Sequence, residues 1–152
     1  MHPHIAFIGG GNMASALIGG LIQQGTPAHH IQVVEPFEEA RTRLRSQFGV
    51  ALFDAPSAAL AQADLVVWAV KPQVFKEAAA PVAPHTREAL HLSVAAGIRS
   101  DSIAAWLGTQ RIVRAMPNTP ALVGLGQSGL FARSGVTADD RSLIESVLRS
   151  TG

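Results

Sequence analysis

A glycine turn between an apolar run and an apolar helical pattern constrains this chain more than any other feature. Residues 5–8 are apolar and predict a buried strand, and the pattern G-x-G-x-x-A follows directly at residues 9–14. Glycine at positions 9 and 11 permits positive φ and close approach of a pyrophosphate, while Ala14 permits close packing of a helix on the strand. We therefore predict a strand, a tight turn and a helix whose first N–H groups bind an anion.

The residues around this turn match a dinucleotide-binding βαβ unit. Apolar residues repeat at helical spacing from Met13 to Ile22, which predicts a helix lying on a sheet. A second apolar strand at 31–34 ends in Glu35, 21 positions after Ala14, where such units place the acid that binds ribose hydroxyls. The alternative is a structural glycine turn in a βαβ unit that binds no ligand.

Composition narrows the classes of protein that fit. The 152 residues are 47% hydrophobic and 15% charged, which predicts one domain spanning 1–152 with a well-buried core. The formal charge of +1 comes with no basic run, which argues against nucleic acid and membrane partners. Cysteine is absent and the longest apolar run, Leu65–Val70, is too short for a membrane span. We expect a cytoplasmic protein without a signal peptide.

Strand and helix patterns alternate along the rest of the chain. Strands are predicted at 50–53, 64–70, 89–94, 111–116 and 126–132. Helices are predicted at 37–48, 57–63, 72–80, 100–107 and from 138 onward. We expect Pro81 and Pro84 to end the third of these helices, and Ser100 or Asp101 to cap the fourth. This alternation predicts an α/β fold, a Rossmann-type doubly wound, mostly parallel sheet with right-handed crossovers.

Four segments are expected to meet at the carboxyl edge of this sheet. They are residues 8–13, 35–36, 69–72 and 93–97. Ligands of such sheets bind outside the carboxyl ends of the strands, where the strand order reverses. The small residues Ala95, Ala96 and Gly97 leave room for a flat ring, although an ordinary tight turn would use the same residues.

Four strings in this order resemble the pyrroline-5-carboxylate reductases. They are F-I-G-G-G-N-M-A at 7–14, A-V-K-P-Q at 69–73, S-V-A-A-G at 93–97 and V-R-A-M-P-N-T-P at 113–120. The first string is shared with enzymes such as the 6-phosphogluconate dehydrogenases, whereas the last one is specific. The resemblance covers most of the chain.

The resemblance implies roles for particular residues. The pyrophosphate would be bound by Ile8, Gly9, Gly10, Gly11, Asn12 and Met13. The adenosine and ribose side would be lined by Ala69, Val70, Lys71 and Pro72, and the nicotinamide by Val94, Ala95 and Ala96. Asn118 and Thr119 would lie close to the substrate, although turn capping is the alternative role for these short polar side chains.

The resemblance also implies a reaction, hydride transfer from NADPH or NADH to the imine of 1-pyrroline-5-carboxylate, giving L-proline. Members of the family carry a helical second domain that dimerises and supplies much of the substrate site through an S-G-S-G-P-A string, which this sequence lacks. We therefore expect a cofactor domain truncated from a homo-oligomeric parent. It would bind dinucleotide without turnover, and the catalytic residues would lie mainly in the missing domain. The alternatives are a related NAD(P)-dependent reductase and a non-catalytic dinucleotide-binding module.

Glu35 favours NADH over NADPH. A carboxylate about 4 Å from a 2′-phosphate is repelled by roughly 1 kcal/mol in water and about 4 kcal/mol at a protein surface. Arg41 or Arg43 could offset this repulsion, and a solvated strand-end glutamate is the alternative.

No metal is expected, because histidines near the terminus and in loops, at positions 2, 4, 29 and 30, are more often exposed bystanders than ligands. Trp68 and Trp106 are expected to pack in the core or an interface and not to stack on a ligand.

Overall fold

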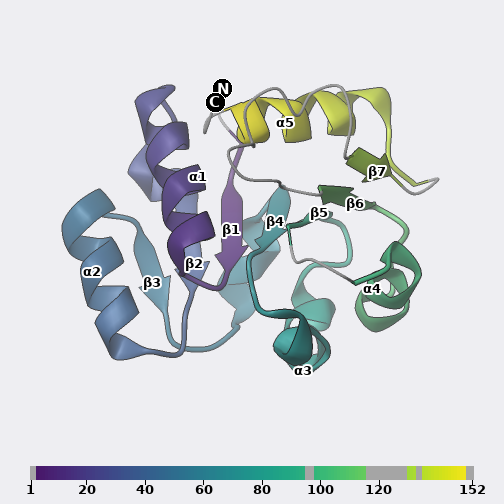
Figure 1. Cartoon of the computed structure of the whole chain (residues 1–152), viewed down its shortest axis with the longest axis horizontal. Helices are drawn as coiled ribbons and strands as arrows, with labels where there is room; N and C mark the ends of the chain where they lie inside the picture. Colours follow the sequence, from purple (N-terminus) through teal and green to yellow (C-terminus); the bar gives the residue numbers. More distant parts are fainter. Residues whose placement is uncertain (1–2, 95–97, 116–129, 133–134, 150–152) are drawn as a thin grey trace.

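The computed structural model describes residues 3–94, 98–115, 130–132 and 135–149 (Figure 1). The strands are β1 (Ile5–Ile8), β2 (Ile31–Val34), β3 (Ala51–Phe53), β4 (Leu65–Trp68), β5 (Leu90–Ser93), β6 (Ile112–Ala115) and β7 (Leu130–Ala132). The helices are α1 (Asn12–Gln23), α2 (Glu38–Phe48), α3 (Pro72–Val82), α4 (Ser100–Leu107) and α5 (Ala138–Arg149). Three short 3₁₀ helices, η1 (Ala28–His30), η2 (Ala58–Gln62) and η3 (Ala83–His85), complete the described elements.

The strands form a single sheet in the order β3-β2-β1-β4-β5-β6-β7. Strands β1 to β6 are all parallel, and β7 pairs antiparallel with β6. From β1 the chain continues to β2 and β3 on one side, and it then crosses to β4 on the other side of β1. The switch point of this doubly wound sheet therefore lies between β1 and β4. The expected Rossmann-type sheet is therefore confirmed.

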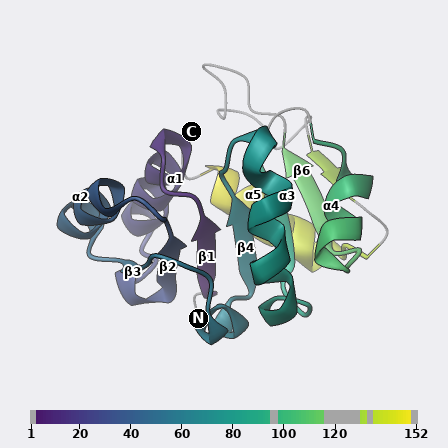
Figure 2. The same cartoon turned by 90° about the horizontal axis from the view of Figure 1, so that it is seen from below.

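Helices cover both faces of the sheet, which explains the near-continuous apolar strands (Figure 2). Ile5 and Phe7 of β1 join a core that includes buried residues of α1, α2 and α5. Ala6 and Ile8 point the other way, into a core shared with α3 and α4. β1 therefore contributes side chains to both cores, and its carboxyl end lies at the switch point beside β4.

Local chemistry fixes two of the helix ends, one through polar side chains and one through a glycine. At the start of α5, the N–H of Asp140 donates to Thr137 Oγ1 and the N–H of Thr137 donates to a carboxylate oxygen of Asp140, each at 3.1 Å. This reciprocal pair is a capping box. Gly49 ends α2 in the left-handed conformation at φ 72°, as its position after the apolar pattern predicts.

Three of the expected boundaries are wrong. Strand β4 ends at Trp68 and not at Val70, because the chain turns after the Ala69 N–H donates to the Ile8 carbonyl at 2.9 Å. Pro81 lies inside α3 and does not end it, since a proline so close to the last residue removes a single backbone hydrogen bond. Arg99 precedes α4, so Ser100 and Asp101 lie within the helix and do not cap it.

The segment expected as a short helix at 57–63 is the 3₁₀ helix η2, which is introduced by Ser57. The hydroxyl of Ser57 accepts from the N–H of Ala59 at 3.3 Å. This short 3₁₀ helix is part of the connection of residues 54–64 between β3 and β4.

Trp68, His91 and Thr86 form a buried hydrogen-bond network on the face of the sheet that α3 covers. The indole Nε1 of Trp68 donates to Nδ1 of His91 at 3.0 Å, and the other ring nitrogen of His91 lies 3.1 Å from the Thr86 carbonyl. An indole N–H can only donate, so Nδ1 accepts and Nε2 carries the proton of a neutral imidazole. Burial, the largest cause, lowers the pKa of His91 from 6.5 to about 4, although the hydrogen bond to Thr86 opposes it.

Trp68 also stacks on Phe75 with ring centroids 4.6 Å apart, and Phe75 lies 5.8 Å from Trp106. The expectation that both tryptophans serve packing is therefore confirmed. Within the part of the chain that the structure describes, no helix is long and apolar enough to cross a membrane.

Candidate functional site: a glycine turn at the switch point

The glycine turn is held tightly between the ends of two neighbouring strands. The N–H of Gly9 donates to the Val34 carbonyl of β2 at 2.9 Å, and its backbone adopts φ +99°. A Cβ added at Gly9 would lie 2.5 Å from the carbonyl oxygen of Ala69, which follows β4. No L-side chain fits this position, so glycine is required here for both conformation and space.

Gly11 differs from Gly9 in a way that the sequence did not predict. Its φ is −80°, so the expected positive φ at this position is wrong. It precedes α1 directly, it is exposed, and a Cβ added to it would meet no atom within 4 Å. The fold therefore does not require glycine here, and the absence of a side chain leaves open space over the amino end of α1.

The first turn of α1 faces this space. The first intrahelical hydrogen bond runs from the Ser15 N–H to the Gly11 carbonyl at 2.9 Å, so the N–H groups of Asn12, Met13 and Ala14 have no acceptor within the helix. The helix dipole adds partial positive charge at the same place. An open, unobstructed helix start of this kind binds anions such as phosphate.

Glu35 stands directly after β2 with 6% of its surface exposed, so the alternative of a solvated glutamate is wrong. One of its carboxylate oxygens accepts from the Gly10 N–H at 2.8 Å and the other accepts from the Phe37 N–H at 3.0 Å. A Cβ added at Gly10 would lie 2.8 Å from Leu44 and 3.2 Å from this carboxylate. Glu35 thus connects the glycine turn to the loop before α2.

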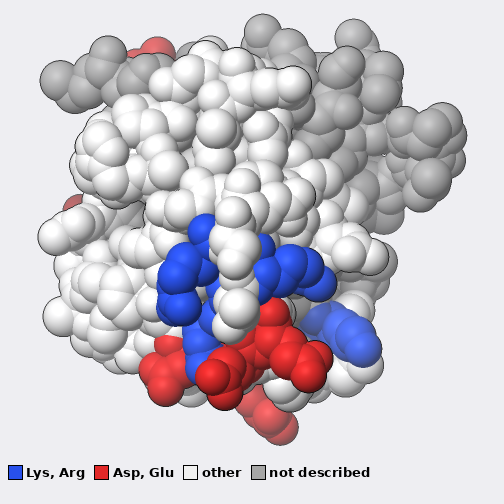
Figure 3. Space-filling view, turned by 90° about the vertical axis from the view of Figure 1, so that its left-hand side faces the viewer, with Lys and Arg blue, Asp and Glu red and all other residues white. Residues whose placement is uncertain are grey.

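Two arginine side chains of α2 donate hydrogen bonds to backbone carbonyls of the glycine turn and of Glu35-Pro36. Nη1 of Arg41 donates to the carbonyls of Glu35 and Pro36 at 2.9 Å each. Nη2 of Arg43 donates to the Gly10 carbonyl at 3.0 Å. Figure 3 looks at this side of the molecule and shows basic and acidic side chains gathered next to each other. The ribose end of the expected site therefore carries a buried carboxylate with two guanidinium groups beside it.

The segment after β4 forms the opposite side of the switch point. Ala69 and Val70 are half-buried there, and the exposed Lys71 precedes Pro72, the first residue of α3. Proline suits this first helical position, as predicted. Val94 is 7% exposed and its N–H donates to the Trp68 carbonyl at 3.1 Å.

The structure brings most of the expected cofactor residues to one edge of the sheet. Those that it places there end or follow β1, β2, β4 and β5: Ile8, Gly9, Gly10, Gly11, Asn12, Met13, Glu35, Ala69, Val70, Lys71, Pro72 and Val94. The other residues predicted for the site, Ala95, Ala96, Asn118 and Thr119, lie outside the described residues.

One residue at this edge was missed by the sequence analysis. Phe37, directly after Glu35-Pro36, has 72% of its surface exposed. An aromatic residue at the position before a helix, where short polar residues are preferred, is the signal that could have found it.

The histidines near the amino end lie at the opposite edge of the sheet. The rings of His4 and His30 stack with centroids 4.2 Å apart, and both are half-buried, so the expectation that they are exposed is wrong. His29 is exposed as expected. In the described ranges no group of three or more histidine, aspartate or glutamate side chains is placed to hold a metal ion.

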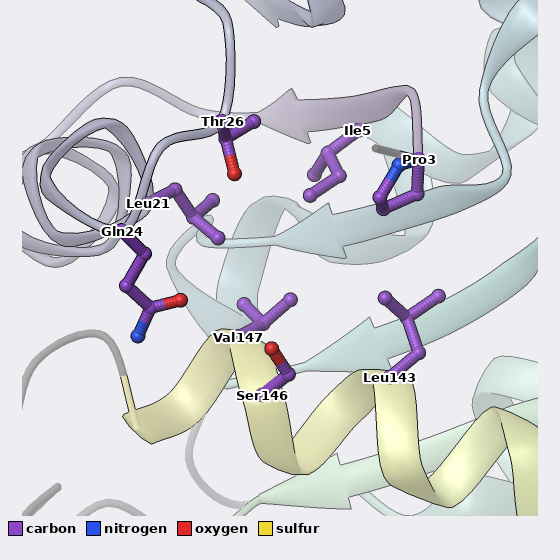
Figure 4. Close-up of a pocket in the computed structure, with 8 residues that line it drawn as sticks. All are labelled: Pro3, Ile5, Leu21, Gln24, Thr26, Leu143, Ser146 and Val147. Atoms are coloured by element: carbon purple, nitrogen blue, oxygen red, sulfur yellow. The ribbon is translucent and has the colours of Figure 1, made fainter. Parts of the chain in front are cut away.

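A separate hollow of about 240 Å³ lies at this opposite edge, between the end of α1, the start of β1 and α5 (Figure 4). Its lining includes Ile5, Leu21 and Val147, with the polar side chains of Gln24 and Ser146. Ile5 begins β1 whereas the glycine turn follows its last residue, so this hollow is distinct from the switch point.

Residues 4–97 match the model of a protein family described as NADP oxidoreductase, coenzyme F420-dependent. The chain belongs to this family. The matched residues contain the glycine turn, Glu35 and the segment after β4, so family membership rests on the same residues as the geometry.

Curated relatives and solved structures that resemble this chain include several pyrroline-5-carboxylate reductases. The chain is 48% identical over 138 residues to a pyrroline-5-carboxylate reductase of Pseudomonas aeruginosa, a match covering 90% of this chain and 50% of the relative. It is 35% identical to that of Escherichia coli K12, covering 100% and 58%. The structure of a pyrroline-5-carboxylate reductase from Coxiella burnetii superposes with a TM-score of 0.86 at 35% identity, covering 99% and 57%.

The resemblance to pyrroline-5-carboxylate reductases that the four strings indicated is confirmed by these matches. The chain spans about half the length of the curated relatives it matches. A more distant relative, the Plasmodium falciparum pyrroline carboxylate reductase with NADP bound, shares the fold with a TM-score of 0.79 at 21% identity.

Proposed function

We propose that this chain is the dinucleotide-binding part of a pyrroline-5-carboxylate reductase. The observation that carries the proposal is the open position at Gly11, where the absent Cβ leaves space for a phosphate over the first N–H groups of α1. The whole enzyme would reduce the imine of 1-pyrroline-5-carboxylate to L-proline. The reduced nicotinamide supplies the hydride when it is bound.

The residues of this chain position the cofactor. The N–H groups of Asn12 and Met13 hold the diphosphate, and Gly9 fixes the bend that aims them at it. Glu35 remains our candidate for the ribose hydroxyls, since each of its oxygens uses one lone pair for a backbone N–H and keeps another. Holding the ring against the imine is a task of proximity that needs no nucleophile.

Gly11→Ala tests the proposal directly. The new methyl group meets no atom of the chain, so we expect the free energy of unfolding to fall by less than about 1 kcal/mol, the difference between glycine and alanine at a helix start. The same methyl group would stand between the helix and the diphosphate, so the affinity for NADH and NADPH should fall at least tenfold, on the order of one lost charge-assisted hydrogen bond. Calorimetric titration and a urea curve measure the two effects. Unchanged affinity would count against the proposal.

We also propose that the chain binds NADH more tightly than NADPH. A 2′-phosphate would approach the buried Glu35 carboxylate, and the two arginines that could neutralise it already donate to backbone carbonyls. Swinging either guanidinium toward the phosphate breaks those hydrogen bonds. Tighter binding of NADPH in calorimetry would reverse this preference.

Glu35→Gln should raise the affinity for NADPH relative to NADH by about fivefold or more, because the repulsion that it removes is worth roughly 1 kcal/mol or more. The glutamine leaves one backbone N–H poorly satisfied, so general weakening is expected. The ratio of the two dissociation constants, measured on the same variant, cancels that weakening. An unchanged ratio would show that Glu35 does not discriminate between the cofactors.

The activity and partners of the whole protein are part of the same proposal. We propose that the parent is a homo-oligomer. We also propose that this chain alone binds dinucleotide without reducing the imine, because it covers about half the length of its relatives. Incubating the purified chain with NADH and 1-pyrroline-5-carboxylate should leave proline undetected. Measurable proline formation would overturn this part.

A further inference from the structure

Two large apolar side chains are exposed among the described residues, and both lie beside the glycine turn. Phe37 has 72% of its surface exposed and Val74 has 41%. Phe37 stands between β2 and α2, and Val74 lies in the first turn of α3, just after β4. Because β2 and β4 pair with β1 from opposite sides, these two side chains flank the end of β1 at the carboxyl edge of the sheet.

The backbone of Phe37 is fixed although its ring is exposed. Its N–H donates to Glu35 at 3.0 Å, and its carbonyl accepts from the N–H of Arg41 at 3.1 Å. The other oxygen of the same Glu35 carboxylate holds the Gly10 N–H. The Glu35 side chain therefore connects the backbone of Phe37 to the glycine turn.

Neither packing nor capping explains a phenylalanine at this position. Positions before a helix favour serine, threonine, aspartate or asparagine, whose side chains cap the first N–H groups, and Phe37 caps nothing. A ring this exposed also gains little from burial in the fold itself. Its apolar face is available to a flat ligand group.

We infer that Phe37 is the stacking residue for the adenine ring of the dinucleotide, with Val74 covering the ring from the opposite side. This inference rests on the proposed binding of a dinucleotide. With the diphosphate over Gly11 and the ribose beside Glu35, the base would lie near Phe37, which follows Glu35-Pro36, and near Val74, which follows the segment 69–72. A purine has an apolar face that stacks on aromatic rings whatever its hydrogen-bonding edge.

Titrations with parts of the cofactor separate this role from a general one. We expect Phe37→Ala to weaken the binding of NADH and of ADP-ribose by about tenfold, the usual effect of removing one base-stacking ring. The binding of reduced nicotinamide mononucleotide, which has no adenine, should stay unchanged. Val74→Ala should weaken NADH and ADP-ribose by a smaller factor, because it removes fewer contacts.

Two further variants act as controls. Phe37→Trp should keep the affinity for ADP-ribose and add an indole whose fluorescence falls on binding, since a larger aromatic ring still stacks. Gln47→Ala changes an exposed residue in the last turn of α2 and should leave all three affinities unchanged. The thermal midpoint of Phe37→Ala should also stay the same, because the ring is largely exposed.

The outcomes distinguish the inference from the proposed function. If the unaltered chain binds neither NADH nor ADP-ribose, the proposed function itself fails. If both bind and Phe37→Ala leaves their affinities unchanged, dinucleotide binding stands and the stacking role is overturned. A change in oligomeric state with unchanged affinities would likewise overturn it, since Phe37 would then serve contact with another copy.

Discussion

We expect Gly9→Ala to lower the free energy of unfolding by about 4 kcal/mol, combining backbone strain of roughly 1–3 kcal/mol with overpacking of similar size. Gly9 has φ +99°, and the new Cβ would stand 2.5 Å from the backbone oxygen of Ala69. Neither of the strands that meet here can retreat, because Gly9 and Ala69 both donate to carbonyls of neighbouring strands. Urea unfolding followed by circular dichroism measures the loss.

Gly25→Ala is the matched control for this variant. Gly25 has φ +103°, close to that of Gly9, but a Cβ added there would meet no atom within 4 Å. Its loss should reflect strain alone, on the order of 1–2 kcal/mol. The difference between the two variants then measures the close approach of β1 and β4. Equal losses would show that this approach does not require glycine at position 9.

Acid should destabilise the protein through His91. The pKa of this buried histidine falls from 6.5 to about 4 on folding, so the folded state disfavours the proton. In the neutral imidazole, Nδ1 accepts the hydrogen bond from the indole N–H of Trp68. Protonation would place a proton on Nδ1, so that two N–H groups would face each other. The stabilising contribution is complete above about pH 6.5 and is lost as the pH falls toward 4. The expected loss over this window is about 3 kcal/mol.

Comparison of pH profiles isolates this contribution from that of the carboxylates. His91→Gln should flatten the dependence of unfolding free energy on pH between 4 and 6.5, whatever its own loss of stability. His29→Gln changes an exposed imidazole and should keep the original slope. If the slope of His91→Gln matches that of the unaltered chain, another group is responsible for acid sensitivity.

The Rossmann-type, mostly parallel sheet was predictable because the strand and helix patterns alternate along the chain. Runs such as Ile5–Ile8 and Leu65–Trp68 are apolar throughout, which favours buried parallel strands. The start of α5 at residue 138 was also predicted. The antiparallel direction of β7 was not, because a three-residue strand carries no signal for its direction.

The meeting of the site's segments at the carboxyl edge of the sheet was predictable, and the contacts between them were less so. The spacing from Ala14 predicted a role for Glu35, but the burial of its carboxylate depends on Gly10 and Phe37 meeting it in space. The sequence could not tell that Gly9 requires glycine for both conformation and space, whereas a side chain at position 11 would meet no atom of the chain. Both distinctions arise from the packing of segments far apart in the chain.

Amide chemical shifts of the ¹⁵N-labelled chain, followed while NADH is added, test the central claim most directly. We predict that the largest and earliest shifts come from Gly11, Asn12, Met13 and Ala14, which lie at the open start of α1. Saturating NADH that leaves these four amides unmoved, or shifts only the residues around the hollow of Figure 4, would contradict it.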